Sequence, residues 1–128
     1  MHRSRLAALV IDCQGGNLDR HAEFWGQALG CPRLPTSEEW AKRYANLATS
    51  PEEVRVLLQK VDHPSRVHLD IETDDITAEV QRLSRLGATV VEVKERWTVM
   101  EAPTGHRFCV VHPQRGDFPD GPGVNCWP

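Results

Sequence analysis

An internal repeat constrains this sequence more than any other feature, because a duplicated chain is expected to fold as two similar modules. A strand-like segment that ends at Asp12 is followed, six residues on, by a helical pattern from Leu18, and the same spacing separates Asp70 from Ile76. The register continues through both helices, whose matching apolar positions are Leu18, Ala22, Trp25 and Ala28 in the first and Ile76, Val80, Leu83 and Leu86 in the second. The repeat predicts two copies of one strand–helix module.

Both helices carry clear start and stop signals. Their apolar residues recur at i, i+4, i+7 and i+10, which is one face of an α-helix. Asn17 is expected to cap the start of the first helix, and Gly30 and Gly87 are expected to end the two helices in a left-handed conformation. Glu79 and Arg82 fall on the polar side of the second helix, where we expect a solvated ion pair.

Strand-like segments fill most of the remaining sequence. They cover 6–13, 44–49 and 54–61 in the first copy, and 67–72, 88–94, 97–102 and 106–112 in the second. The sequence at 36–39 has the form of a capping box, which predicts a short helical turn over Trp40. Helices segregated to one face of mostly antiparallel sheet indicate an α+β fold. We expect tandem βαβββ modules whose curled, mixed or antiparallel sheets form a cup, with the helices outside.

The predicted organisation is a single domain over residues 1–128. Module one covers about 5–62, module two about 66–113, and an irregular tail follows at 114–128. Phe118 and Trp127 are expected to pin this tail, which is rich in proline and glycine.

Charge and composition exclude several classes of partner. The net charge is −3 and no basic run occurs, so nucleic acid is not an expected partner. No apolar stretch approaches the roughly 20 residues that span a bilayer, and the first residues lack the features of a signal peptide. The four cysteines form no Cys-x-x-Cys pair, so a zinc knuckle or a thioredoxin-like site is not expected. Because no secretion signal is seen, we expect reduced thiols. These features predict a cytoplasmic protein with no membrane contact.

Three stretches together resemble the glyoxalase/bleomycin-resistance/extradiol-dioxygenase superfamily, also called the vicinal oxygen chelate superfamily. Residues 18–30 resemble its helix with an aromatic pair followed by Leu-Gly, and residues 67–88 resemble its second-module signature. Residues 102–111 resemble its closing hairpin, with Ala102 and His106 where that hairpin usually has Asp and Asn. The similarity covers about residues 5–113, and the nearest subgroup is the glyoxalase-like domain proteins. It implies a cup that binds a small molecule, and a homodimer.

The resemblance also implies where a metal would bind. Superfamily enzymes usually hold a divalent metal through one residue from the first and last strands of each module. Those positions correspond here to Val10, Gln59, His68 and Cys109. Val10 cannot coordinate a metal, His68 matches the usual ligand, and the other two are unusual donors. We therefore expect a degenerate site with no resident cofactor; a divalent metal bound by His68, Gln59 and Cys109 is the alternative.

His68 and Asp70 are the candidate catalytic residues. Polar and apolar residues alternate strictly over 66–72, so both side chains should share one strand face. The apolar face is expected to meet the helices, and the polar face to line the cup. An imidazole suits metal binding, proton transfer and ligand hydrogen bonding alike. Asp70 and the equivalent Asp12 would suit acid–base chemistry, or they would simply cap the following loops.

The candidate ligand-binding residues combine aromatic, apolar and polar side chains. They are Tyr44, Gln59, Trp97, Met100 and Cys109. The aromatic and apolar members suit a planar ligand. His106 and Arg107 are expected in an exposed turn. Two main functions stay open: a small-molecule-binding protein with an apolar, aromatic cup, and a metal- or His68-dependent lyase, isomerase or dioxygenase. A module that binds another protein is a third reading.

Overall fold

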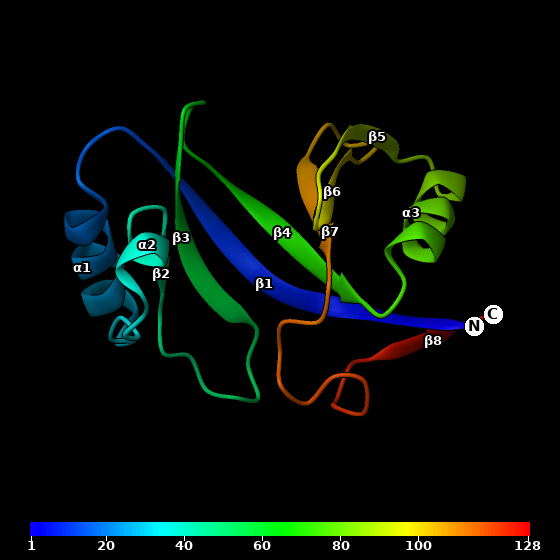
Figure 1. Cartoon of the computed structure of the whole chain (residues 1–128), viewed down its shortest axis with the longest axis horizontal. Helices are drawn as coiled ribbons and strands as arrows, with labels where there is room; N and C mark the ends of the chain where they lie inside the picture. The colour runs from blue at the N-terminus through cyan, green and yellow to red at the C-terminus, as the bar shows by residue number, and fades with distance from the viewer. The chain divides into compact units, whose positions relative to one another are not determined.

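The computed structural model describes residues 1–128 and confirms the α+β class, with eight strands and three helices (Figure 1). The elements in chain order are β1 (His2–Gln14), α1 (Leu18–Leu29), α2 (Glu38–Ala41), β2 (Tyr44–Asn46), β3 (Arg55–Val61), β4 (Arg66–Thr73), α3 (Ile76–Arg85), β5 (Thr89–Val93), β6 (Trp97–Glu101), β7 (Arg107–Val111) and β8 (Asn125–Trp127). No helix is long and apolar enough to cross a membrane.

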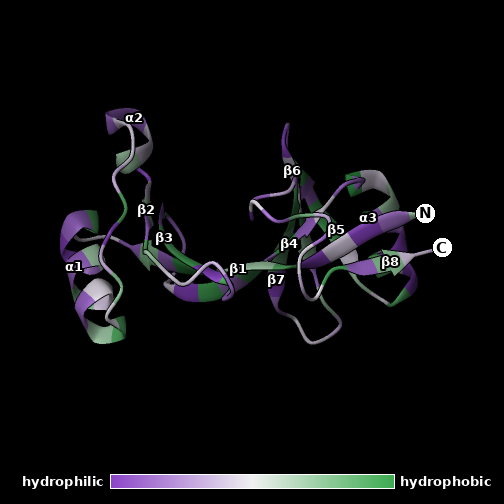
Figure 2. Cartoon of the chain, turned by 90° about the horizontal axis from the view of Figure 1, so that it is seen from below, coloured by the Kyte–Doolittle hydropathy of each residue, from purple (hydrophilic) through white to green (hydrophobic).

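The chain divides into two compact units, which are described separately. The first-module unit is Ala8–Val67, and the second-module unit joins Met1–Ala7 to His68–Pro128. Hydrophilic and hydrophobic residues are interspersed along α1 and α3 (Figure 2), as expected for helices that place one side against a sheet.

In the first-module unit, α1 covers one face of a small sheet. The β1 residues from Ala8 onward pair in parallel with β3, and β3 pairs antiparallel with β2. The Asn17 side chain accepts a hydrogen bond from the Arg20 backbone N–H at 3.2 Å, and Gly30 has φ 69°, so both predicted signals are confirmed. The buried core of this unit is Cys13, Leu18, Ala22, Ala45, Leu47 and Leu58.

Two local predictions in this unit have different outcomes. The helical turn over Trp40 is confirmed as α2, whose Ser37 cap accepts from the Trp40 N–H at 3.2 Å. The strand predicted over 44–49 ends instead at Asn46. After Asn46 the chain also pairs with the segment before α2: Leu47 forms an isolated bridge with Arg33, and the Ala48 N–H donates to the Pro32 carbonyl at 2.8 Å.

In the second-module unit, α3 covers one face of a four-stranded sheet. β4 pairs in parallel with β7, β7 antiparallel with β6, and β6 antiparallel with β5. The buried core under α3 is Leu83, Ala88, Met100, Phe108 and Val110. This order makes the module a complete βαβββ unit.

The apolar side of β4, which was expected to meet the helices, is only partly covered. Ile71 packs against the core, but Val67 is 58% exposed and Leu69 is 43% exposed. The main packing contacts of α3 are with β5, β6 and β7, which leaves these β4 side chains less covered.

The tail is not wholly irregular as predicted, because its last residues form β8 against the first residues of β1. The Trp127 indole N–H donates to the Ser4 hydroxyl at 2.8 Å, and the Arg82 guanidinium carbon lies 3.9 Å from the Trp127 ring centroid. Trp127 therefore pins the tail, as expected.

The prediction of a solvated Glu79–Arg82 pair is wrong, since Glu79 is fully buried. Its carboxylate accepts from Arg82 Nε at 2.7 Å and is paired with His2 Nε2 at 2.8 Å. Burial alone favours the neutral acid, but the hydrogen bonds from Arg82 and His2 outweigh it and hold the pKa of Glu79 below its usual value. The start of β1 thus covers a side of α3 that the sequence pattern leaves polar.

A second buried ion pair anchors the tail to the sheet. Arg5, which is 4% exposed, donates from Nε to Glu72 at 2.7 Å and also contacts Asp117. The other oxygen of Glu72 accepts from the backbone N–H groups of Gln114 and Arg115 at 2.8 and 2.9 Å. Glu72 therefore links β4, β1 and the tail within one unit.

Candidate functional site

Strand register gathers the candidate residues of the second module other than Met100 on the sheet face opposite to α3, here called the site face. Directly opposed residues in a sheet have side chains on the same face. Asp70 is opposed to Cys109, and Cys109 to Val99, which makes one row across β4, β7 and β6. On one side of this row lies a second row, made of Glu72, Val111 and Trp97. On its other side, toward His68, lies the opposed pair Arg107 and Glu101.

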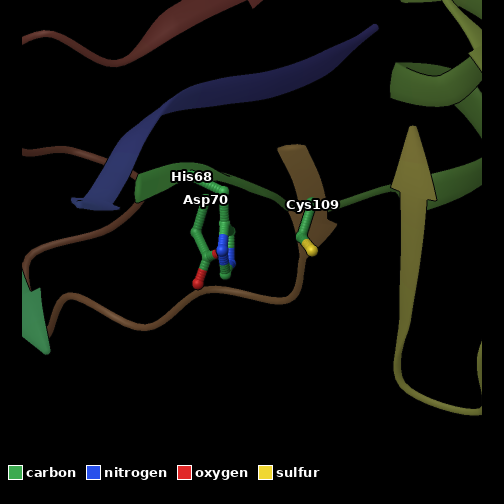
Figure 3. A group of neighbouring side chains, drawn as sticks. All are labelled: His68, Asp70 and Cys109. Atoms are coloured by element: carbon green, nitrogen blue, oxygen red, sulfur yellow. The ribbon is translucent and has the colours of Figure 1, made fainter. Parts of the chain in front are cut away.

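His68, Asp70 and Cys109 form a compact cluster of three different donor atoms (Figure 3). One donor atom from each side chain lies within 4.8 Å of those of the other two. The distance from His68 Nε2 to Asp70 Oδ1 is 3.4 Å, and the two side chains are only 11% and 10% exposed. Alternation along β4 brings the histidine and aspartate together, and β7 supplies the thiol.

Trp97 and Met100 fall on opposite faces of β6. Trp97 is partly buried on the site face, one step along the sheet from the Asp70–Cys109–Val99 row. Met100 is opposed to Phe108, is 0% exposed and packs in the core under α3. Its side chain therefore faces the protein interior, and Trp97 is the predicted apolar residue that the structure places on the site face.

The remaining candidates lie in the first-module unit. Asp12 is opposed to Gln59, and Gln59 to Tyr44, so these residues form the same kind of row as Asp70, Cys109 and Val99. The repeat therefore extends to the site positions. Tyr44 stacks on Trp40 with ring centroids 4.3 Å apart. Gln59 belongs to this unit, whereas Asp70, which was not among the predicted metal ligands, joins His68 and Cys109.

Asp12 has two basic side chains as neighbours in its own unit. Its carboxylate is 3.8 Å from Arg66 Nε and 3.8 Å from His63 Nε2. Val10 precedes Asp12 by two residues, in the position that His68 occupies before Asp70. The two equivalent rows therefore carry different chemistry.

Arg107 is the residue of the site face that sequence reasoning missed. It begins β7 rather than lying in an exposed turn, and its side chain is 38% exposed. Arg107 Nε donates to Glu101 at 3.0 Å. His106 is exposed, as predicted, and its ring contacts Thr104. Side chains alternate between the two faces of a strand, and Arg107 is two residues before Cys109. The sequence could therefore have placed Arg107 on the same face as Cys109.

The donor set at His68, Asp70 and Cys109 fits a divalent metal. Imidazole nitrogen, carboxylate oxygen and thiolate sulfur are the three side-chain donors that zinc uses in proteins. Three protein donors also leave a position for a small molecule, as in catalytic zinc sites. Sulfur and nitrogen donors disfavour magnesium and calcium, which prefer oxygen.

The fold is that of a glyoxalase-type protein: two similar modules, each with a helix on one sheet face and polar residues on the other. Residues 8–111 match the family model described as Glyoxalase-like domain, and the chain belongs to this family. It is thereby a member of the glyoxalase/vicinal oxygen chelate superfamily, which confirms the resemblance seen in the sequence.

Solved structures of low sequence identity share the fold. Methylmalonyl-CoA epimerase from Mycobacterium tuberculosis is 18% identical, with TM-score 0.61 over 86% of this chain and 88% of that chain. NAD-dependent benzaldehyde dehydrogenase from Legionella pneumophila is 12% identical, with TM-score 0.63 over 84% and 98%. Hypothetical protein BH1468 from Bacillus halodurans C-125 is 12% identical, with TM-score 0.62 over 87% and 95%. No curated protein matches the sequence.

Proposed function

We propose that this protein binds a small oxygen-bearing molecule on the site face, with a divalent metal ion of the zinc type held by His68, Asp70 and Cys109. The observation that carries the proposal is the convergence of three different donor atoms within 4.8 Å. A protein of this fold, methylmalonyl-CoA epimerase, has been solved with the oxygen-bearing ligand methylmalonyl-CoA and is 20% identical to this chain.

The chain's own residues would bind, orient and shield the ligand. His68 and Asp70 are almost completely buried, so their positions are fixed by packing as well as by their mutual contact. Val99 and Trp97 supply apolar surface beside the polar cluster. When bound, the metal would act as a Lewis acid that polarises a ligand oxygen, which suits a lyase or isomerase.

Binding without a metal is the second candidate, and Val10 favours it. Val10 stands where the superfamily usually has its first metal ligand, and an aliphatic side chain contributes no donor. In this reading His68 donates a hydrogen bond to the ligand, and Trp97 provides a stacking surface.

Metal content separates the two candidates. We expect about one equivalent of zinc in protein purified without chelator, and its loss in His68→Ala and Cys109→Ala. His106→Ala is the matched control, because it removes an exposed histidine that directly precedes β7. Circular dichroism would establish that each variant is folded. Wild-type protein that contains no metal, and takes none up from added zinc, would leave only metal-free binding.

From the family resemblance we also propose a homodimer in the cytoplasm. Sedimentation equilibrium at micromolar concentration should give twice the chain mass of 14.4 kDa. A monomer mass would refute this part of the proposal.

A further inference from the structure

Arg107 lies beside the His68–Asp70–Cys109 cluster on the site face. It precedes Cys109 by two residues on β7, so both side chains have the same orientation relative to the sheet. The register pairs Leu69 with Phe108, and one step back along both strands sets His68 beside Arg107. Neighbouring strands are about 4.8 Å apart and alternate residues about 6.6 Å apart. A small molecule can therefore contact the guanidinium and the cluster together.

The contacts of Arg107 leave its binding groups available. Nε donates to Glu101 at 3.0 Å, and this is the one hydrogen bond that the Arg107 side chain makes within the chain. The two terminal amino groups, Nη1 and Nη2, are the parallel donors that form a fork with a carboxylate. Because Glu101 holds Nε, the fork is oriented before a ligand arrives, and less rotamer freedom is lost on binding.

We propose that Arg107 anchors the carboxylate of the ligand, which makes the ligand class a 2-hydroxy- or 2-oxo-carboxylate. The carboxylate would form a fork with Nη1 and Nη2, and the neighbouring hydroxyl or oxo oxygen would reach the His68–Asp70–Cys109 cluster. The contact of the hydroxyl or oxo oxygen with the cluster rests on the proposed function. The contact of the carboxylate with Arg107 does not depend on it. Glu101 acts as a positioning residue.

Apolar residues define the rest of the ligand. Val99 is opposed to Cys109, and Trp97 is opposed to Val111 in the next row. Trp97 is partly buried, with Lys94 Nζ 5.9 Å from its ring centroid. A carboxylate with an apolar or aromatic substituent therefore matches this face better than a small, fully polar acid.

Calorimetric titration with mandelate and with its methyl ester tests the anchor. Mandelate carries a carboxylate, a 2-hydroxyl and a ring, and its methyl ester keeps the hydroxyl and the ring but replaces the charged carboxylate with a neutral group. Arg107→Met removes the guanidinium and keeps most of the apolar stem, whereas Arg107→Lys keeps the charge without the fork. Arg85→Met is the matched control, because Arg85 is an exposed arginine on α3, on the other side of the sheet.

We expect mandelate to bind wild-type protein more tightly than the ester does, and Arg107→Met to weaken mandelate binding on the order of 10- to 100-fold. The affinity of Arg107→Lys for mandelate should fall between those of wild type and Arg107→Met. Arg85→Met should change the affinity less than twofold. Ester binding should be the same in wild type and Arg107→Met. Thermal unfolding would show that Arg107→Met is folded.

Three results would overturn the inference: no mandelate binding by wild type at millimolar concentration, no preference for acid over ester, or unchanged binding by Arg107→Met or Arg107→Lys. Metal analysis of the same samples keeps the two proposals distinct. Carboxylate binding that depends on Arg107 in metal-free protein would support the anchor and contradict the metal site. Protein that retains its metal and binds mandelate equally well without Arg107 would support the metal site and contradict the anchor.

Discussion

Replacing Glu72 with alanine should strongly destabilise the protein. Glu72 is 0% exposed and is the partner of the buried Arg5 guanidinium. Removing one member of a buried ion pair costs about 3–5 kcal/mol, because the other charge stays buried. The loss also leaves the N–H groups of Gln114 and Arg115 without their acceptor. Against a total stability of about 5–15 kcal/mol for a domain, this is a large fraction.

Urea unfolding followed by circular dichroism measures the free energy directly, and Tm should fall by roughly 10 °C or more. Glu72→Gln should lose less, because its amide oxygen can still accept from the two backbone N–H groups. Glu92→Ala is the control: Glu92 is exposed and paired only with Lys94 at 3.3 Å, so its loss should stay within about 0.5 kcal/mol. A loss below about 1 kcal/mol for Glu72→Ala would show that Arg5 and the tail find other partners, and would refute the reasoning.

Three further changes test particular contacts. The pKa of Glu79 is lowered by folding, so its contribution to stability is present above the unfolded pKa and is lost as pH falls through the folded value; the drop in unfolding free energy below about pH 4.3 should be smaller in Glu79→Gln. Burial, with a smaller effect of a nearby carboxylate, raises the pKa of the Cys13 thiol, so iodoacetamide should alkylate Cys13 far more slowly than the exposed Cys126, as mass spectrometry would show; equal rates would contradict its burial. Glu101→Gln should tighten mandelate binding severalfold, because it removes a negative charge beside Arg107 and keeps an acceptor for Nε; weaker binding would mean that the charge of Glu101 holds the guanidinium in place.

Local signals in the sequence predicted the modules well. The cap at Asn17, the left-handed Gly30 and the apolar stripes depend on residues three to four positions apart, so the sequence alone contains the information. The internal repeat added register, because equal spacing after Asp12 and Asp70 implies equivalent strands. The structure agrees, with Gln59 opposed to Asp12 as Cys109 is to Asp70.

Contacts between distant parts of the chain were not predictable in the same way. The sequence pattern predicts a solvent-exposed Glu79, because its neighbours on α3 are polar. In the structure, His2, which is 77 residues away in sequence, covers it. The tail at 114–128 has no periodicity, so the pairing of β8 with β1 leaves no pattern to detect. In both cases the partner is far away in sequence, and only the fold brings it close.

Strand parity explains the outcome for the site residues. Trp97 and Met100 are three positions apart in one strand, so they could not share a face, and only Trp97 lies on the site face. His68 and Asp70 are two apart and do share one. Arg107 lies within the predicted strand 106–112, but it was expected to be exposed in the turn, so its alternation with Cys109 was not used.

The two modules show how one substitution in a duplicated frame changes the chemistry of a site. Each has an aspartate at the same strand position, opposed to a residue with a donor atom, Gln59 in one and Cys109 in the other. In the second module the residue two positions before the aspartate is His68, which adds a third donor. In the first module it is Val10, and the carboxylate of Asp12 has Arg66 and His63 at 3.8 Å. A guanidinium so close to Asp12 repels a second cation, which disfavours a metal ion in the first-module row. The duplication therefore sets where polar residues can gather, and the difference between Val10 and His68 gives the second module the three-donor cluster on which the proposed metal site rests.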